Sequence, residues 1–334
     1  MHDEFDLTGG DGTRLVAWRN RNDTGPRVLI CNGMAVPTQA WPRLLSEDSQ
    51  FNVAGWNHRG CFGSDRPADP DAVRIEDHVA DAVALLDHLG WDSAIVVGWS
   101  LGVNVAFELA KEHPERVSGM LGVAGVPGGT FDTLFAPQLV PRVLRRPLGT
   151  NVARLGRLIS PGLNFISKNL PTGRPLGEML RFSGVVLPHA SQEHVADWAG
   201  NMFKDQDFDW YFHLALGLAE HEEFDPSFMK CPVTVVAGSV DFLTSGQDVI
   251  RAATKIPNVE VHTLPGTHCL PLEFPEEIEE MLTDLAARVE WQASLAAARA
   301  EAGITDEIVD DGDPIVDLND EELIAVRDPD FVGT

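Results

Sequence analysis

The chain has 334 residues, 44% of them hydrophobic, and a formal net charge of −26 at pH 7. This length allows one large α/β domain with an insertion, or two domains. The negative charge argues against a nucleic-acid partner, because phosphates would be repelled. We find no run near the roughly 20 apolar residues of a membrane span. The acidic N-terminus lacks the features of a signal peptide, and the four scattered cysteines lack metal-ligand spacing. We therefore expect a cytoplasmic protein with free thiols and no cofactor or metal.

The first part of the chain alternates between short apolar runs and segments with helical spacing. The expected strands are a hairpin at 4–7 and 14–19, followed by 27–31, 51–56, 93–97 and 117–124; the expected helices are 76–89 and 103–112. Alternation of this kind predicts an α/β fold with a mostly parallel sheet covered by helices on both faces.

The alternation stops after residue 129 and resumes near residue 232. Residues 130–226 are rich in proline, aromatic residues and short helical patterns, with no convincing strand. Strands are then expected at 232–238 and 259–264, and helices near 246–255 and 274–300. We interpret 1–129 and 227–300 as the core domain, 130–226 as a mainly helical lid inserted between two strands, and 301–334 as an acidic tail. The tail carries twelve Asp and Glu residues against one Arg.

The most informative motif is Gly98-Trp99-Ser100-Leu101-Gly102, between an expected strand and an expected helix. Gly-x-Ser-x-Gly in this position is typical of a nucleophile elbow, a turn so tight that only glycine fits on either side of the serine. The turn lifts the serine hydroxyl clear of the backbone at the start of the helix. The motif predicts Ser100 as a nucleophile.

A serine nucleophile needs a general base and a group that orients the base. In doubly wound sheets, ligands bind beyond the carboxyl ends of the strands, so both groups are expected there. Asp241 follows the strand at 232–238, and His268 follows the strand at 259–264. The order Ser100, Asp241, His268 is the one expected when an elbow serine leads. Weaker candidates for the acid are Asp132, Glu223 and Asp225.

The tetrahedral intermediate of acyl transfer needs backbone N–H donors. One is expected from Leu101, directly after the nucleophile. The second is expected from Met34, in the loop that follows strand 27–31, where Gly33 lets the chain pass close to the substrate. The alternative is that Asn32-Gly33 forms an ordinary turn.

These motifs resemble those of the α/β-hydrolase superfamily of serine hydrolases, over about residues 10–297. Asn57-His58-Arg59-Gly60-Cys61-Phe62-Gly63-Ser64 is similar to the family's Asp-x-Arg-Gly-x-Gly-x-Ser loop, with asparagine in place of the aspartate. Asn32-Gly33 stands where the family usually has His-Gly. The resemblance implies Ser100 as nucleophile, His268 as base, Asp241 as its orienter, and Met34 and Leu101 as oxyanion donors. Epoxide hydrolases and haloalkane dehalogenases of this fold carry an elbow aspartate, whereas this chain has Ser100.

The lid contains a basic segment, although the protein as a whole is acidic. Residues 141–181 contain eight Lys or Arg against Glu178 alone. The lid also holds large apolar residues, namely Phe131, Leu134, Phe135, Leu139, Phe165, Met179, Phe182, Trp198, Met202, Phe203, Trp210 and Phe212. Two interpretations are open. These residues either form the lid's own core beneath solvated arginines, or they roof an acyl-chain pocket while Arg142, Arg145 and Arg146 contact an anion.

The anion of the second interpretation would be a lipid headgroup surface or the phosphates of an acyl thioester. Residues 142–157 interleave Arg with Leu and Val, as interfacial segments do. We expect Pro147 and Gly149 to break any continuous helix in this stretch.

Taken together, the sequence predicts a carboxylic ester hydrolase, an esterase or lipase, that forms an acyl-enzyme at Ser100 on small-molecule esters with an apolar acyl group. Other chemistries on the same triad are a thioesterase, an acyltransferase, a C–C bond hydrolase and a cofactor-free haloperoxidase. A non-catalytic binding protein on a hydrolase scaffold is the alternative of a different class. The sequence leaves the oligomeric state open.

Overall fold

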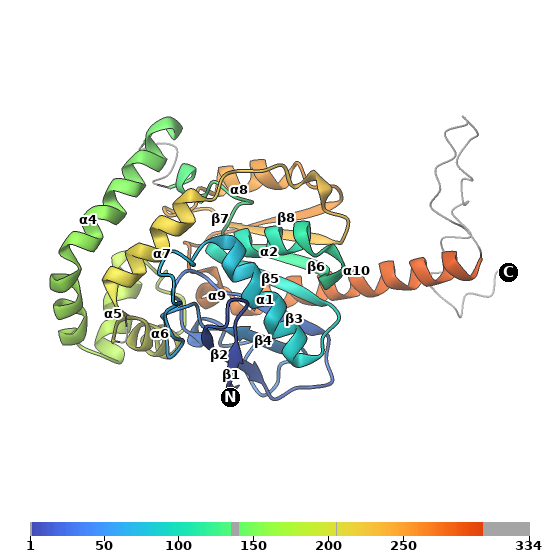
Figure 1. Ribbon diagram of the computed structural model, residues 1–334, viewed down its shortest axis with the longest axis horizontal. Coiled ribbons are helices and arrows are strands. Elements are labelled where there is room, and N and C mark those ends of the chain that lie inside the picture. The colour runs from blue at the N-terminus through green and yellow to red at the C-terminus, as the bar shows by residue number, and fades with distance from the viewer. Residues whose placement is uncertain (1, 135–139, 205, 303–334) are drawn as a thin grey trace. The chain divides into compact units, whose positions relative to one another are not determined.

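The computed structural model describes residues 2–134, 140–204 and 206–302 (Figure 1). The chain divides into two compact units, Met1–Trp291 and Gln292–Thr334, and every strand belongs to the first. Among the described residues, no helix is long and apolar enough to cross a membrane. The predicted acidic tail at 301–334 lies almost entirely outside the described residues.

An eight-stranded sheet forms the centre of the first unit. Its strands are β1 (His2–Thr8), β2 (Arg14–Asn20), β3 (Arg27–Cys31), β4 (Asn52–Trp56), β5 (Ala94–Trp99), β6 (Val117–Val123), β7 (Val233–Gly238) and β8 (Val259–Leu264). The spatial order is β1-β2-β4-β3-β5-β6-β7-β8. Pairs β1–β2 and β2–β4 are antiparallel, and all other neighbours are parallel. The sheet confirms the predicted α/β fold class and its mostly parallel sheet.

Helices cover both faces of this sheet because its central strands are apolar on both sides. The core helices are α1 (Ile75–Leu89), α2 (Leu101–Glu112), α8 (Gly246–Ala253), α9 (Leu270–Glu273) and α10 (Pro275–Glu301). Alternate residues of β5 enter different hydrophobic clusters. Val96 packs in the cluster that contains α1, α2 and α8 residues. Ile95 and Val97 pack in the one that contains residues from the start of α10.

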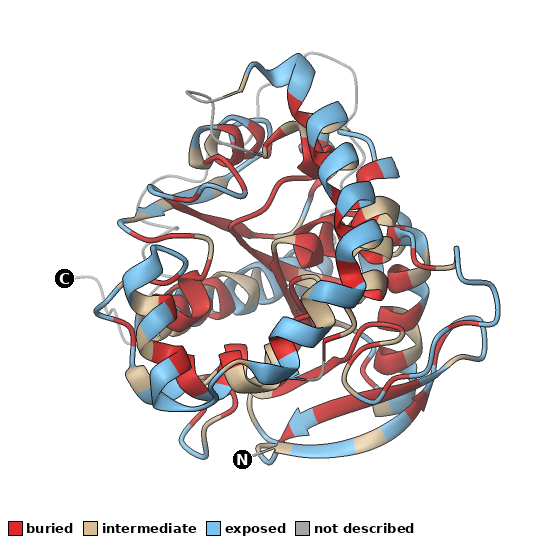
Figure 2. Ribbon diagram, turned by 90° about the vertical axis from the view of Figure 1, so that its left-hand side faces the viewer, coloured by how far each residue is buried: buried red, intermediate tan, exposed pale blue. Residues whose placement is uncertain are grey.

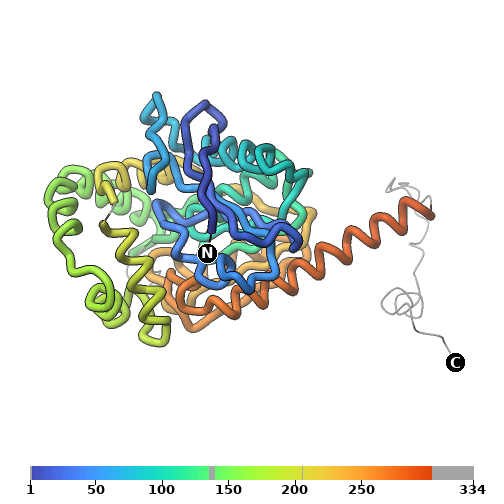
Figure 3. Tube along the Cα trace, turned by 90° about the horizontal axis from the view of Figure 1, so that it is seen from below, coloured from blue at the N-terminus to red at the C-terminus, as the bar shows by residue number. Residues whose placement is uncertain are grey.

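The chain between β6 and β7 is helical in its described part. It comprises η3 (Thr130–Asp132), α4 (Arg142–Asn169), α5 (Arg174–Ser183), α6 (Gln192–Lys204), α7 (Phe208–Glu220) and η4 (Pro226–Phe228). Helices α4 to α7 gather on one side of the sheet in both views (Figures 1 and 3). We call α4 to α7 the cap.

The prediction that Pro147 and Gly149 break the helix was wrong, because α4 runs unbroken for 28 residues. A proline inside a helix removes one backbone hydrogen bond to the carbonyl four residues earlier. At Pro147 that carbonyl belongs to Val143, an 80% exposed residue in the first turn of the helix. At Pro161, the second proline of the helix, it belongs to Arg157, and the Ser160 hydroxyl donates to it instead at 2.7 Å. Gly149 serves close packing, since a Cβ there would lie 2.9 Å from Phe131 Cδ1.

Candidate active site

Ser100 occupies a strained turn between β5 and α2. Its backbone has φ 55° and ψ −115°, a left-handed conformation that side-chain-bearing residues rarely adopt. The Ser100 N–H donates to the Val123 carbonyl at 3.0 Å, which ties the turn to β6. The flanking glycines are required by space: a Cβ on Gly102 would lie 1.7 Å from the Cys31 carbonyl oxygen, and one on Gly98 2.6 Å from the Gly102 oxygen. This geometry is that of a nucleophile elbow.

His268 and Asp241 form a close pair at the ends of β8 and β7. His268 Nδ1 lies 2.8 Å from Asp241 Oδ2. The other oxygen, Asp241 Oδ1, accepts the Leu243 and Thr244 N–H groups, each at 2.8 Å. The Asp241 side chain is 0% exposed and that of His268 is 13% exposed. The carboxylate is therefore fixed by three donors and can orient the imidazole, with Nδ1 protonated and Nε2 left free to accept a proton.

Trp99 connects the elbow to His268. The indole Nε1–H donates to the His268 carbonyl at 2.9 Å, and the two rings lie 6.0 Å apart. Since Trp99 directly precedes Ser100, this hydrogen bond ties the turn that carries Ser100 to the loop that carries His268, at the carboxyl ends of two parallel strands. The structure thus brings Ser100, His268 and Asp241 to one edge of the sheet.

The weaker acid candidates lie elsewhere. Glu223 pairs with Arg142 and with Lys255, whose Nζ is 3.3 Å away. Asp225 accepts the Ser227 N–H at the start of η4. Asp132 ends η3 and, like the other two, forms no hydrogen bond or ion pair with His268 among the described residues. Of the four carboxylates, Asp241 is the one beside the imidazole.

The loop after β3 is held in shape by Asn32. Its Oδ1 accepts the Gly33 N–H at 2.9 Å and the Trp41 indole N–H at 3.1 Å, and its Nδ2 donates to the Val36 carbonyl at 2.9 Å. Within the part of the chain that the structure describes, the Met34 N–H has no protein acceptor. The Leu101 N–H, at the first position of α2, has no intrahelical acceptor. Both predicted oxyanion donors are thus available to a ligand.

His58 is a supporting residue that sequence reasoning did not assign. Its Nδ1 accepts the N–H of Ala35, a residue held at φ 49°, over 3.2 Å. Burial is the main cause that lowers the pKa of His58 well below its ordinary value, and the neighbouring His78 lowers it further. The imidazole therefore stays neutral and keeps the lone pair that this hydrogen bond needs.

Asn104 is a second residue that the sequence did not single out. It is fully buried on α2, one turn after Ser100, and its Oδ1 accepts the Gly128 N–H at 3.0 Å. His221 Nδ1 lies 3.1 Å from the same oxygen. Gly128 and His221 belong to the two chain segments that lead into and out of the cap. Asn104 therefore fixes both segments to α2, the helix that directly follows Ser100.

Glu273 holds the loop that presents His268. Its Oε2 accepts the Thr267 N–H at 2.8 Å, and its Oε1 accepts the Thr267 hydroxyl and the Leu187 N–H at 2.7 Å each. Glu273 is buried. No local pattern in the sequence signals this role, because Leu187 lies 86 residues away.

The cap arginines predicted to contact an anion are mostly engaged with protein. Arg145 is buried and donates to Asp248 Oδ2 at 2.9 Å, so its guanidinium cannot serve as the predicted anion contact. Arg142 pairs with Glu223, and Arg146 lies 3.9 Å from Glu222.

The large apolar residues of the predicted lid at 130–226 divide between two environments. Phe131, Trp198 and Trp210 are buried, as the cap-core interpretation expects, whereas Phe165 and Phe182 are exposed. Phe135 and Leu139 lie outside the described residues.

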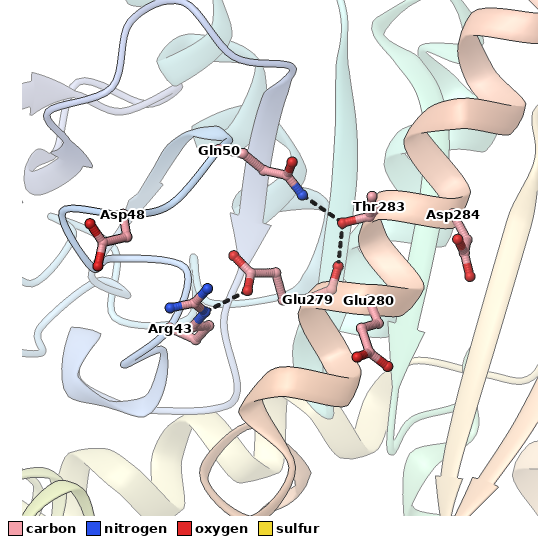
Figure 4. Close-up of a pocket in the computed structure, with 7 residues that line it drawn as sticks. All are labelled: Arg43, Asp48, Gln50, Glu279, Glu280, Thr283 and Asp284. Carbon is pink, nitrogen blue, oxygen red and sulfur yellow. Dashed lines mark hydrogen bonds and ion pairs between the residues drawn. The ribbon is translucent and has the colours of Figure 1, made fainter.

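A surface hollow of about 500 Å³ lies between the loop that follows η1 (Thr38–Ala40) and helix α10 (Figure 4). Its lining is Arg43, Asp48, Gln50, Glu279, Glu280, Thr283 and Asp284. Arg43 pairs with Glu279, and none of the predicted catalytic residues reaches it. This acidic hollow is separate from the triad, and we assign it no function.

Comparison with known proteins agrees with the geometry of the elbow. The family model described as "alpha/beta hydrolase fold" matches residues 26–275, most of the chain. The chain belongs to the α/β-hydrolase family. The superfamily resemblance seen in the motifs is thereby confirmed.

Relatives of this α/β-hydrolase carry several names. A protein of Caulobacter sp. (strain K31), provisionally named carbamate hydrolase RutD, is 34% identical over 252 residues, covering 75% of this chain and 86% of the relative. Epoxide hydrolase B of Mycobacterium tuberculosis is 30% identical over 133 residues, 36% of this chain. The matched part of the chain spans only 37% of the length of epoxide hydrolase B.

Solved structures share the fold. A thermophilic esterase from Thermogutta terrifontis superposes with a TM-score of 0.63 and 21% identity, over 86% of this chain and 99% of that one. At this identity the likeness concerns the fold alone, so the activity has to be argued from the site.

Proposed function

We propose that this α/β-hydrolase cleaves carboxylic esters with an apolar acyl group, as an esterase or lipase, through an acyl-enzyme at Ser100. The observation that carries the proposal is the 2.8 Å contact between His268 Nδ1 and Asp241 Oδ2, beside a serine held at φ 55°. A strained serine next to an oriented imidazole is the arrangement of activated nucleophiles. Elbow aspartates belong to the epoxide-hydrolase chemistry of this fold, and Ser100 stands in their place.

The geometry supports the following reaction. Ser100 Oγ attacks the ester carbonyl carbon, and its proton passes to His268 Nε2 while Asp241 stabilises the imidazolium. The oxyanion is bound by the Met34 and Leu101 N–H groups. His268 then protonates the leaving alkoxide, which departs as the alcohol. A water molecule releases the acid from the acyl-enzyme by the same steps, with His268 taking the water proton.

The preference for apolar acyl groups rests on the loop that carries Asp241. Its neighbours Val240, Phe242 and Leu243 are exposed hydrophobic side chains, although the residue between them is a buried carboxylate. Exposed apolar side chains beside a reactive centre favour substrates that cover them.

Carbamate hydrolysis is a second candidate, supported by the relative that is 34% identical over 252 residues and carries that provisional name. Carbamates and esters can share the acyl-enzyme at Ser100 and differ in the leaving group. The two candidates are therefore separated by substrate and not by mutation of the triad.

The test is hydrolysis of p-nitrophenyl esters from acetyl to palmitoyl, with labelling of Ser100 by a fluorophosphonate. We expect turnover that rises beyond acetyl, disappears in Ser100→Ala, and falls about 10⁴-fold in kcat in Asp241→Asn. Asp92→Asn, a change of the same type at an exposed position, should leave turnover intact. Labelling without ester turnover would redirect the proposal to carbamates or another acyl group, and absence of labelling would overturn it.

A further inference from the structure

Helix α4 turns its large hydrophobic residues outward. Nine of them are between 42% and 80% exposed: Val143, Leu144, Leu148, Val152, Leu155, Leu158, Ile159, Phe165 and Ile166. At about 100° per residue they fall on one half of the helix circumference. Figure 2 views this side of the molecule and shows α4 crossing in front, largely in the colour of exposed residues. On α5, Met179 and Phe182 are exposed as well.

The inward face of α4 explains this orientation. Apart from Arg145, its buried residues are small: Gly149, Ala153, Gly156, Ser160 and Ser167. A Cβ on Gly156 would lie 2.4 Å from the Phe212 ring of α7. The helix axis therefore lies too close to α7 for a leucine on that side. Only the small face fits inward, and the apolar face has no covering element in the described part of this chain.

The charges along this face are of one sign. The 28 residues of α4 include six Arg or Lys and no Asp or Glu, in a chain with 51 acidic residues. Arg157 pairs with Asp209, and Arg142 and Arg145 are paired as described above. Exposed Arg154 and Lys168 on α4 form no ion pair or hydrogen bond with any described residue. Both lie toward one edge of the apolar half.

We propose that the outer face of α4, with Met179 and Phe182 of α5, binds the surface of an anionic lipid bilayer. The apolar side chains would enter the boundary between headgroups and acyl chains, and Arg154 and Lys168 would contact lipid phosphates, as interfacial amphipathic helices do. The helix lies on the membrane and does not cross it, since no described helix qualifies as a span. The proposal does not depend on which ester the site cleaves.

Charge favours a lipid surface over a second copy of the chain. In a symmetric dimer, Arg154 and Lys168 of each copy would lie toward the apolar face of the other copy. No Asp or Glu of α4 could pair with them there. The strongly acidic remainder of the protein should itself be repelled by an anionic membrane, so binding must be confined to this basic, apolar surface. These opposing charges predict a fixed orientation with the cap toward the bilayer.

The test is co-sedimentation of full-length Ser100→Ala protein, which leaves lipid esters intact, with vesicles of phosphatidylcholine and phosphatidylglycerol in equal parts. Vesicles of phosphatidylcholine alone are the comparison. We expect the protein to bind the anionic vesicles. Its affinity for the neutral vesicles, and for the anionic vesicles in high salt, should be at least about tenfold lower. Leu158→Gln/Phe165→Gln and Arg154→Glu/Lys168→Glu should each weaken binding by at least about tenfold.

Two matched controls keep the test specific. Val261→Gln alters an exposed hydrophobic residue on β8, and Arg19→Glu/Arg27→Glu reverses the same number of charges on β2 and β3; both should bind normally. The α4 variants should keep the wild-type melting temperature, which separates lost binding from unfolding. Absence of binding to anionic vesicles, or equal binding by the α4 variants, overturns the proposal. A wild-type dimer that becomes monomeric in Leu158→Gln/Phe165→Gln, without lipid binding, would make the face a subunit interface and also overturn it.

Discussion

Helices α2 and α4 place their hydrophobic residues in opposite ways. Helix α2 buries ten of its 12 residues, including Val103, Phe107 and Leu109. Helix α4 buries six of 28, and none of the six is a large hydrophobic residue. Both helices approach a neighbour closely through glycine, α2 at Gly102 and α4 at Gly156. The difference lies on the other side of each helix, where α2 meets more protein and α4 meets solvent.

This contrast separates two tasks within one compact unit. A serine at positive φ costs of order 1–3 kcal/mol and persists only where its surroundings enforce it. Helix α2, packed on all sides, supplies that enforcement directly after Ser100. Helix α4 needs only one narrow face to stay in place, and its remaining surface is free to contact something outside the chain.

The largest effect that sharpens the comparison is expected from one substitution made on both helices. Leu109 on α2 is 0% exposed and Leu158 on α4 is 78% exposed. Leu109→Ala should lower the free energy of unfolding by about 2–5 kcal/mol, because it leaves a cavity in a packed core. Leu158→Ala should change it by less than about 0.5 kcal/mol. Urea unfolding of the two variants at pH 7 measures both values. A cost at Leu158 close to that at Leu109 would mean that α4 is covered in solution, and the contrast would fail.

A smaller effect concerns a polar group that the core buries without satisfying it. His78 on α1 is 0% exposed, and neither ring nitrogen has a hydrogen-bond partner among the described residues. Burial, together with the charge of Arg59, lowers the pKa of His78 to about 3. At pH 5 the unfolded chain, with an ordinary histidine pKa near 6.5, binds a proton that the native state does not. The contribution of His78 to the free energy of unfolding therefore falls as the pH drops below about 6.5, and this loss is complete below about pH 3.

The prediction is that His78→Leu removes this loss. Between pH 7 and pH 5, the free energy of unfolding of the wild type should fall by about 2 kcal/mol because of His78. The fall in the variant should be smaller by that amount. The same change at exposed His194 should leave the pH dependence of the unfolding free energy as in wild type. Parallel pH profiles for His78→Leu and wild type would show that the buried imidazole has a partner in solution.

Much of the core could be predicted from sequence because its signals are local. Continuous apolar runs such as residues 28–31 of β3 mark strands buried on both faces. Helix α1 repeats buried positions at helical spacing and ends at Gly90, whose φ of 65° suits a helix terminus. The elbow motif lies between one such strand and one such helix, and this predicted the position of Ser100 in the fold. The positions of Asp241 and His268 were predicted from the ends of the strands that precede them.

The cap helix was mispredicted because its continuity depends on side-chain details that composition does not carry. Pro161 is tolerated where the Ser160 hydroxyl satisfies the carbonyl that the proline leaves open. Gly149 and Gly156 are contact points against Phe131 and Phe212, not helix breakers. Exposure of the apolar face could not be inferred either, because an amphipathic pattern shows that a helix has two faces and not which one is inward.

The smallest predicted effect concerns Glu273, which joins the core to the chain segment between α5 and α6. Glu273 accepts hydrogen bonds from Thr267, next to His268, and from Leu187, which follows α5 in the cap. Glu273→Gln keeps the size of the side chain but replaces one acceptor oxygen with a donor, so one of these N–H groups loses its partner. A small displacement of His268 should lower kcat about tenfold, near 1.4 kcal/mol of transition-state stabilisation, with KM unchanged because Glu273 is placed to act through His268 and not on substrate.

The rate at which a fluorophosphonate labels Ser100 measures the same effect without a known substrate, since in the proposed mechanism this rate depends on His268 as the base. Glu276→Gln, an exposed position three residues further on, is the matched control and should label at the wild-type rate. A merely structural role for Glu273 would lower the melting temperature of Glu273→Gln without slowing labelling of the folded protein. Slower labelling at an unchanged melting temperature would instead mean that the cap and His268 are joined through this carboxylate. Contact between the cap and an outside surface would then be able to shift His268 through Glu273.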